Sequence, residues 1–170
     1  MNRRKFIKAG LAGTAVLAVG GAWLAWRELR EADEDGVRRD PIGTVVTAVA
    51  PALLGDMLSR DAHRPARLAR VVDGVHQIIA AFPAATRHEI SELFGILDTG
   101  LPRRMLTGIG VDWPHAADAD IAVFLDRWRH SRIALLQSGY FALHDLVLGA
   151  WYADPANWDA IGYAGPPNVE

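Results

Sequence analysis

Residues 64–82 read RPARLARVVDGVHQIIAAF, and this stretch decides the predicted fold. Its larger apolar side chains recur at helical spacing on one face: Leu68, Val71, Val72, Val75, Ile78 and Ile79. Apolar residues repeating near 3.6 positions predict an amphipathic helix with one buried face. Pro83 follows directly, and we expect the helix to end there because proline has no amide hydrogen to donate.

The same period appears on both sides of this stretch. Residues 44–58 predict a helix that Pro51 should kink or restart. Residues 86–97 predict another, beginning at Thr86 because Thr86 and Glu89 have capping-box spacing. Residues 105–117 contain Gly108, Gly110 and Pro114 and predict a loop.

A longer helix is predicted from Asp118 or Asp120, either of which can cap it, to about Tyr152, with a bend at Gly139. Its buried stripe comprises Ile121, Phe124, Leu125, Trp128, Leu135, Leu136, Tyr140, Leu143, Val147 and Trp151. No segment alternates with period two. We therefore predict an all-α fold, a small bundle of about four main helices with an irregular aromatic C-terminal tail.

The N-terminus combines basic residues with an uncharged run from Ala9 to Trp26. As a helix this run is about 27 Å long, close to the roughly 30 Å hydrocarbon core of a bilayer. The preceding N-R-R-K-F-I-K resembles the twin-arginine translocation signal, with the mild departures Asn2 and Ile7. The signal residues are Arg3, Arg4, Phe6 and Lys8. The alternative is an ordinary membrane anchor held by its flanking positive charges.

The domain organisation follows from this leader. Residues 1–26 are the signal or signal anchor, residues 27–41 a charged tether, and residues 42–170 the helical domain. Ala18-Val19-Gly20 lies inside the apolar run and is a poor cleavage site. We expect an uncleaved helix that anchors the chain in the membrane, with removal of the leader as the alternative.

Composition limits the chemistry. The chain has no cysteine, which excludes disulfides, thiolate catalysis and cysteine-ligated iron–sulfur clusters. Beyond Trp26 the acidic side chains outnumber the basic ones. We therefore expect no nucleic acid partner, because phosphate binding needs a concentrated basic surface.

The histidines do not form an obvious metal site. A zinc helix needs a second histidine four residues after His88, and position 92 is Glu. His115 with Asp118 and Asp120 can be written as a ligand set, but a polar loop leading into a helix cap explains them more simply. We expect ordinary structural or surface roles for His76, His130 and His144, and a salt bridge for Arg132. No catalytic residue and no metal ligand is predicted.

The C-terminal segment, residues 149–168, reads GAWYADPANWDAIGYAGPPN. Asp154 and Pro155 should end the long helix. Rigid aromatic side chains near an exposed end suit a docking surface. The candidate partner-binding residues are Trp151, Tyr152, Pro155, Trp158, Ile161, Gly162, Tyr163 and Pro166. The alternative is a cap that packs on its own bundle.

The pattern W-Y-x-D-P-x-x-W-x-x-I-G-Y-x-G-P resembles the end of the gluconate 2-dehydrogenase subunit 3 family. The resemblance is strongest over residues 124–166 and looser over residues 44–98. Some relatives carry cysteines near this region, and this chain has none. Family members are typically short, helical and exported by the twin-arginine pathway. They accompany a large FAD-dependent oxidoreductase of the glucose–methanol–choline type, often with a c-type cytochrome subunit.

The resemblance implies an accessory subunit without an active site. It would bind no cofactor, because the FAD would belong to the large dehydrogenase subunit. It would carry that folded flavoprotein through the twin-arginine translocase and stabilise or anchor it in the periplasm, at the cytoplasmic membrane. Two other functions stay open. One is a membrane-tethered periplasmic scaffold or binding protein unrelated to a flavoprotein, and the other is a small metal-dependent periplasmic enzyme.

Overall fold

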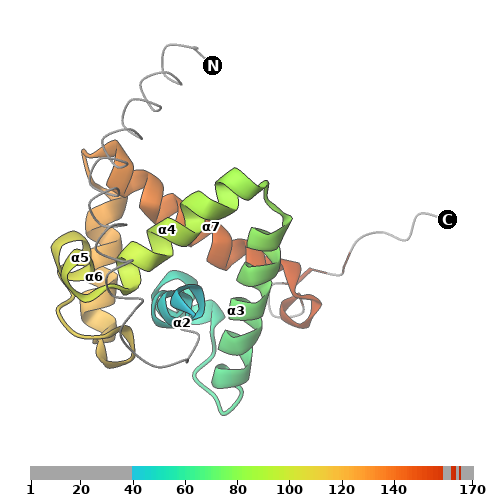
Figure 1. The fold of residues 1–170 in the computed structure, drawn as a ribbon. Helices are drawn as coiled ribbons and strands as arrows, with labels where there is room; N and C mark the ends of the chain where they lie inside the picture. The colour runs from blue at the N-terminus through green and yellow to red at the C-terminus, as the bar shows by residue number, and fades with distance from the viewer. Residues whose placement is uncertain (1–39, 159–161, 164, 166–170) are drawn as a thin grey trace, which may run out of the picture. The chain divides into compact units, whose positions relative to one another are not determined.

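The computed structural model describes residues 40–158, 162, 163 and 165. These residues form six α-helices and no strand, which confirms the predicted all-α class (Figure 1). The compact unit that contains them begins at Asp40. The predicted export signal and nearly all of the predicted tether lie outside the described residues. The helices are α2 (Pro41–Leu54), α3 (Arg64–Ala81), α4 (Ala84–Asp98), α5 (Gly100–Thr107), α6 (Asp118–Arg129) and α7 (Ala134–Ala153).

Helix α2 lies at the centre of the bundle. Figure 1 looks almost along its axis and shows α3, α4, α6 and α7 around it, and α2 packs against all four. A helix surrounded in this way must be apolar on most sides. This explains why its fully or almost fully buried residues do not keep to one narrow stripe: Val45, Val46, Val49, Ala50 and Leu54.

The two ends of α2 are set by local chemistry. The Asp40 carboxylate accepts a hydrogen bond of 2.9 Å from the amide of Gly43, which caps the helix at its start. Pro51 does not end the helix, which continues to Leu54. A 3₁₀ turn, η1 (Gly55–Met57), follows, and Gly55 has the positive φ of 53° that glycine adopts without strain.

Helix α3 confirms the prediction from its apolar period, and Val71, Val75 and Ile79 are its buried residues. It packs against both α2 and α7. The contact with α7 is close at Gly74, where a β-carbon would stand 2.9 Å from the Cβ of Ala150. Two small residues thus allow the two helix backbones to approach.

The region between α4 and α6 differs from the prediction. Helix α4 begins at Ala84 after Pro83, so the predicted capping-box start at Thr86 is wrong. Residues 105–107, predicted as loop, complete the short helix α5, and Gly108 caps its end with φ of 81°. Two buried side chains hold this region through bonds that local patterns do not reveal. Arg103 donates to the Asp98 carbonyl at 3.2 Å, and Trp113 in η2 (Trp113–His115) donates to the Leu97 carbonyl at 3.0 Å.

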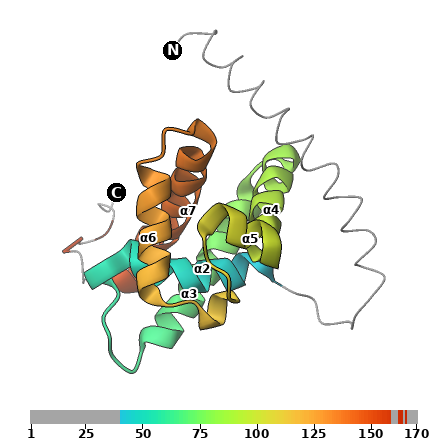
Figure 2. The same cartoon turned by 90° about the vertical axis from the view of Figure 1, so that its left-hand side faces the viewer.

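The predicted long helix is in fact two helices, α6 and α7, joined by a turn at residues 130–133 (Figure 2). The break is not at Gly139, which lies inside α7 against Trp128 of α6. Neither predicted aspartate caps α6, because Asp118 is already its first helical residue. Leu135, expected in the buried stripe, is 51% exposed beside the turn. The apolar period continues across the turn, so it gave no sign of the break.

The aromatic part of the core lies between α6 and η2. The rings of Trp113 and Phe124 are 6.1 Å apart between centroids, and those of Phe124 and Trp128 are 5.0 Å apart and nearly perpendicular. Among the described residues, none of the helices combines the length and apolar character needed to cross a membrane.

Candidate functional site: the C-terminal aromatic segment

The end of α7 fixes the position of the C-terminal segment. One oxygen of the Asp154 carboxylate accepts from the amide of Ala156 at 2.9 Å and so caps the 3₁₀ turn η3 (Pro155–Asn157). The other accepts from Nε of Arg70 on α3, also at 2.9 Å. One aspartate therefore ends the helix, as the Asp-Pro pair predicted, and ties the following chain to a different helix.

Trp151 belongs to the core of the bundle. Its side chain is 1% exposed. The buried side chain of Asn157 folds back and donates to the Trp151 carbonyl at 3.0 Å. For these two residues the structure supports the alternative in which the segment caps its own bundle. Trp151 was predicted both on the buried stripe and in the docking set, and the structure places it on the buried stripe.

Tyr152, the next residue on α7, is 45% exposed. Its hydroxyl donates to the sulfur of Met57 at 3.6 Å, which links the ring to η1. Its carbonyl accepts a hydrogen bond of 2.9 Å from the indole nitrogen of Trp158. Tyr152 therefore presents half of its surface to solvent while its position is fixed at both ends.

Trp158 and Tyr163 form a ring pair beyond η3. Their centroids are 5.2 Å apart and the rings are nearly perpendicular, at 77°. The amide of Tyr163 donates to the Trp158 carbonyl at 3.0 Å. Gly162 has φ of 69°, a value that favours glycine, and it turns the chain so that the two rings meet. Tyr163 is 46% exposed and Trp158 is half-buried.

We call Tyr152, Trp158 and Tyr163 the aromatic surface. Pro155 is exposed beside it, and Gly162 shapes it. The structure thus brings together five of the eight predicted partner-binding residues at the surface and places a sixth, Trp151, beneath it. The remaining two, Ile161 and Pro166, lie outside the described residues, as do the predicted export residues Arg3, Arg4, Phe6 and Lys8.

The sequence did not predict which residues hold the aromatic surface in place. Met57 contacts Tyr152, and Arg70 contacts Asp154 in the same C-terminal segment, each from a position far away in the chain. A half-buried methionine and a surface arginine carry no local pattern that would reveal these contacts. Asn157 stood inside the quoted motif but had no predicted role.

The histidines that sequence analysis considered lie mostly in pairs with single carboxylates. His76 is 3.0 Å from Asp40, and His130 is 3.1 Å from Asp126. His88 is near Glu92 and His144 near Asp145. His115 lies in η2. No group of three or more potential metal ligands occurs in the described part of the chain.

The pKa of the Asp61 side chain is clearly lowered. The backbone amide of His63 donates to its carboxylate at 2.9 Å and lowers the pKa below the ordinary value of 3.8, and Arg67 acts in the same direction. The carboxylate lies in the loop before α3 and Arg67 in the first turn of α3, and the two form a fork of hydrogen bonds. This arrangement orders the loop and the start of the helix.

No family model, curated protein or solved structure matches this chain. The resemblance to the gluconate 2-dehydrogenase subunit 3 family therefore stays a prediction that rests on the residues of the C-terminal segment and the N-terminal motif.

Proposed function

We propose that this chain is a non-catalytic accessory subunit of a periplasmic oxidoreductase complex. It binds a large FAD-dependent dehydrogenase, carries it in folded form through twin-arginine export, and stabilises or anchors it at the cytoplasmic membrane. In line with the family resemblance, a c-type cytochrome subunit would be the third member of the complex. Catalysis and FAD belong to the partner in this proposal.

The observation that carries the proposal is the aromatic surface. Tryptophan and tyrosine are enriched among the side chains that contribute most to the binding energy of protein interfaces. Here they are also held in one arrangement by the bonds between Tyr152, Trp158 and Met57 and by the ring contact with Tyr163. A surface ordered before binding loses less conformational entropy when a partner docks. The C-terminal motif that resembles the family includes the residues of this aromatic surface, which supports its role in docking.

The N-terminal motif supports the export role. Twin-arginine export moves folded proteins, and a flavoprotein that acquires FAD in the cytoplasm must cross the membrane folded. A small subunit that carries the signal can bring a partner that lacks one. The docking surface and the signal are the two parts that such a subunit needs.

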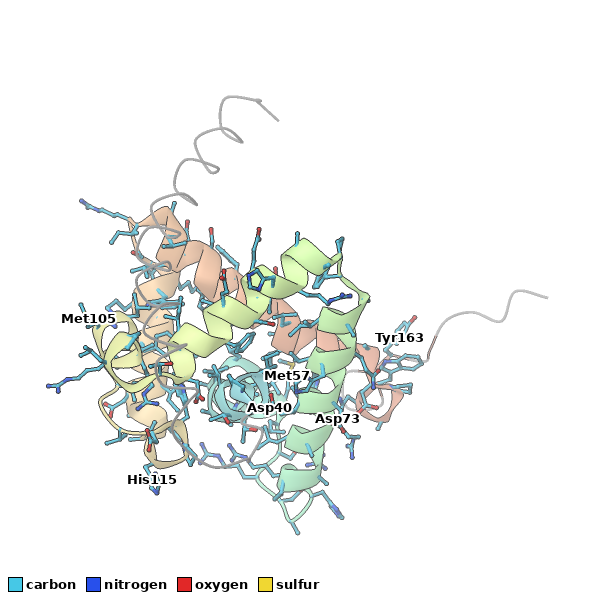
Figure 3. All side chains as sticks on the ribbon, viewed as in Figure 1. Asp40, Met57, Asp73, Met105, His115 and Tyr163 are labelled. Carbon is cyan, nitrogen blue, oxygen red and sulfur yellow. The ribbon has the colours of Figure 1, made fainter. Side chains whose placement is uncertain are left out.

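The test is co-purification from the native envelope with a C-terminal tag on this chain. We expect a large flavoprotein to co-purify, identified by mass spectrometry and by flavin absorption. Trp158→Ala combined with Tyr163→Ala should reduce its recovery. Met105→Ala is the matched control, because Met105 is 77% exposed on α5 and lies on the opposite side of the bundle from Tyr163 (Figure 3).

The alternatives give different results. A lone colourless chain recovered from fresh membranes would contradict the proposal and favour the membrane-tethered scaffold. A stoichiometric metal in that lone chain would favour the small enzyme. If the double variant loses its helical circular dichroism, the rings belong to the core, and the aromatic surface no longer supports docking.

A further inference from the structure

An open groove runs along α2 on the side that faces α3 and the chain leading into α6. Its volume is about 630 Å³, within the range of small-molecule sites. Apolar side chains form most of its lining, among them Ala48, Val72, Trp113 and Ile121. Thr44 and Thr47 add hydroxyl groups along α2.

The charged side chains that line this groove are all carboxylates: Asp40, Asp73 and Asp118. Figure 3 shows Asp40 at the start of α2 and Asp73 on α3. Asp40 already caps α2 and pairs with His76 at 3.0 Å. No hydrogen bond or ion pair joins the side chain of Asp73 or of Asp118 to another described residue. Two carboxylates therefore stand beside an apolar floor without a neutralising cation from the described chain.

We infer that this groove is a docking site for an extended cationic segment of a partner protein. An arginine or lysine of that segment would contact Asp73 and Asp118, and an adjacent apolar side chain would cover the floor. Arginine suits the position because its planar guanidinium binds carboxylates through two hydrogen bonds at once. Carboxylates at the groove disfavour nucleic acid and anionic lipid, whose phosphates they repel.

This inference rests on the proposed function in one respect, because it assigns the cationic segment to the large dehydrogenase subunit. It adds a second contact to the aromatic surface and specifies its chemistry. The cationic segment would neutralise these carboxylates when it binds, so the contact should be sensitive to ionic strength.

The experiment uses the full chain in its native envelope, with a photo-activated cross-linking residue at Thr47, which is exposed and lines the groove. The same residue at Ser91, exposed on α4 away from the groove, is the control. We expect Thr47 to capture one peptide that contains arginine or lysine, and Ser91 not to capture it. Mass spectrometry of the cross-linked peptide identifies the segment.

Charge variants then test the recognition. Asp73→Asn should reduce the cross-linking yield about threefold, as for removal of one exposed ion pair, and Asp73→Lys should reduce it further. Glu89→Gln and Glu89→Lys are the matched controls, because Glu89 is exposed on α4 and does not line the groove. An acidic residue placed in the captured segment should restore the yield with Asp73→Lys.

Four results would overturn the inference: no cross-link from Thr47, a cross-link to lipid, a cross-link to a second copy of this chain, or capture of a segment without basic residues. The experiments distinguish failure of the groove inference from failure of the proposed function. If the flavoprotein co-purifies with undiminished yield when Thr47 captures nothing, only the groove fails. If Thr47 captures a basic segment of another protein and no flavin co-purifies, the groove still binds a cationic segment, but the proposed function and the assignment of that segment to the dehydrogenase both fail.

Discussion

Gly139 lies inside α7 directly against the indole ring of Trp128 on α6. A β-carbon at this position would stand 2.6 Å from Cζ3 of the ring and 3.1 Å from Cε3. The ring is 2% exposed, and its nitrogen donates to the Leu106 carbonyl at 3.1 Å. It also packs edge-on against Phe124. Gly139→Ala must therefore move a buried ring that has two other contacts to lose.

The magnitude follows from opposing effects. Alanine is favoured over glycine inside a helix by about 1 kcal/mol. Overpacking a filled core costs about 1–3 kcal/mol, and loss of the Trp128 hydrogen bond costs about 1 kcal/mol more. For Gly139→Ala we expect the free energy of unfolding to fall by about 1–3 kcal/mol.

Gly149→Ala is the matched control, because it makes the same substitution in the same helix. A β-carbon there would meet only the Cδ1 atom of Ile78, at 3.4 Å, which is an ordinary contact with the end of a flexible side chain. We expect this variant to gain about 0.5–1 kcal/mol. The difference between the two variants isolates the Trp128 contact from helix propensity.

The assay is urea unfolding of the purified full chain, followed by far-ultraviolet circular dichroism. Near-ultraviolet circular dichroism would report on the environment of the tryptophan rings. The reasoning is refuted if the two variants shift the urea midpoint in the same direction by similar amounts. That result would mean that α6 and α7 do not meet at Trp128 and Gly139.

Three further predictions concern other parts of the chain. Arg103→Ala should lower the free energy of unfolding by about 1–3 kcal/mol in urea titrations, because a buried side chain and its bond to a helix-end carbonyl are lost together. Arg103→Met should lower it less, because the methionine side chain refills the space left by the arginine. The carboxyl of Asp61 should titrate below 3.8 by nuclear magnetic resonance, and His63→Pro, which removes the donating amide, should raise that pKa. Since the folded pKa is lowered, the stabilisation from Asp61 should be present above its unfolded pKa and be lost as the pH falls through the folded one. Lysine at both Arg3 and Arg4 should keep this chain and its flavoprotein in the cytoplasmic fraction.

The sequence predicted those helices whose boundaries are local. Helix α3 has one apolar face and a proline directly after its last residues, so its period and its end were both visible. The start of α4 was missed because Pro83 placed the first turn two residues before the capping-box pattern. Here the backbone geometry of proline set the start of the helix, and the capping-box spacing of side chains did not.

The elements that the sequence missed depend on contacts between distant residues. Helix α5 is short and contains glycine and proline, and its position depends on the buried Arg103. The turn between α6 and α7 interrupts a continuous apolar period, and the reversal is shaped by the contact of Trp128 with Gly139. Neither contact can be read from spacing along the chain.

In the candidate site, too, the sequence predicted the features that depend on neighbouring residues and missed those that depend on distant contacts. The sequence predicted that aromatic residues gather at the C-terminus and that Asp154 ends the helix. Consecutive residues on a helix point about 100° apart, so Trp151 and Tyr152 can have separate roles. The sequence did not show that Trp151 belongs to the core and Tyr152 to the surface. The roles follow from packing between distant elements: Trp151 is 1% exposed in the core, whereas Tyr152 is 45% exposed and contacts Met57.

Helix α3 joins the two surfaces proposed for the partner. Arg70 holds the segment that carries the aromatic surface, and Asp73, three residues further along the same helix, lines the acidic groove. One partner that contacts both surfaces would bind through two small contacts on a rigid support. Once one contact forms, the second is intramolecular, so a variant that lacks either contact should retain part of the binding. Complete loss of partner binding should need Asp73→Lys together with Trp158→Ala. The losses of binding free energy from the two variants should be close to additive if the two surfaces act independently. If a single variant abolishes binding of the partner, the two surfaces do not act independently and form one interface.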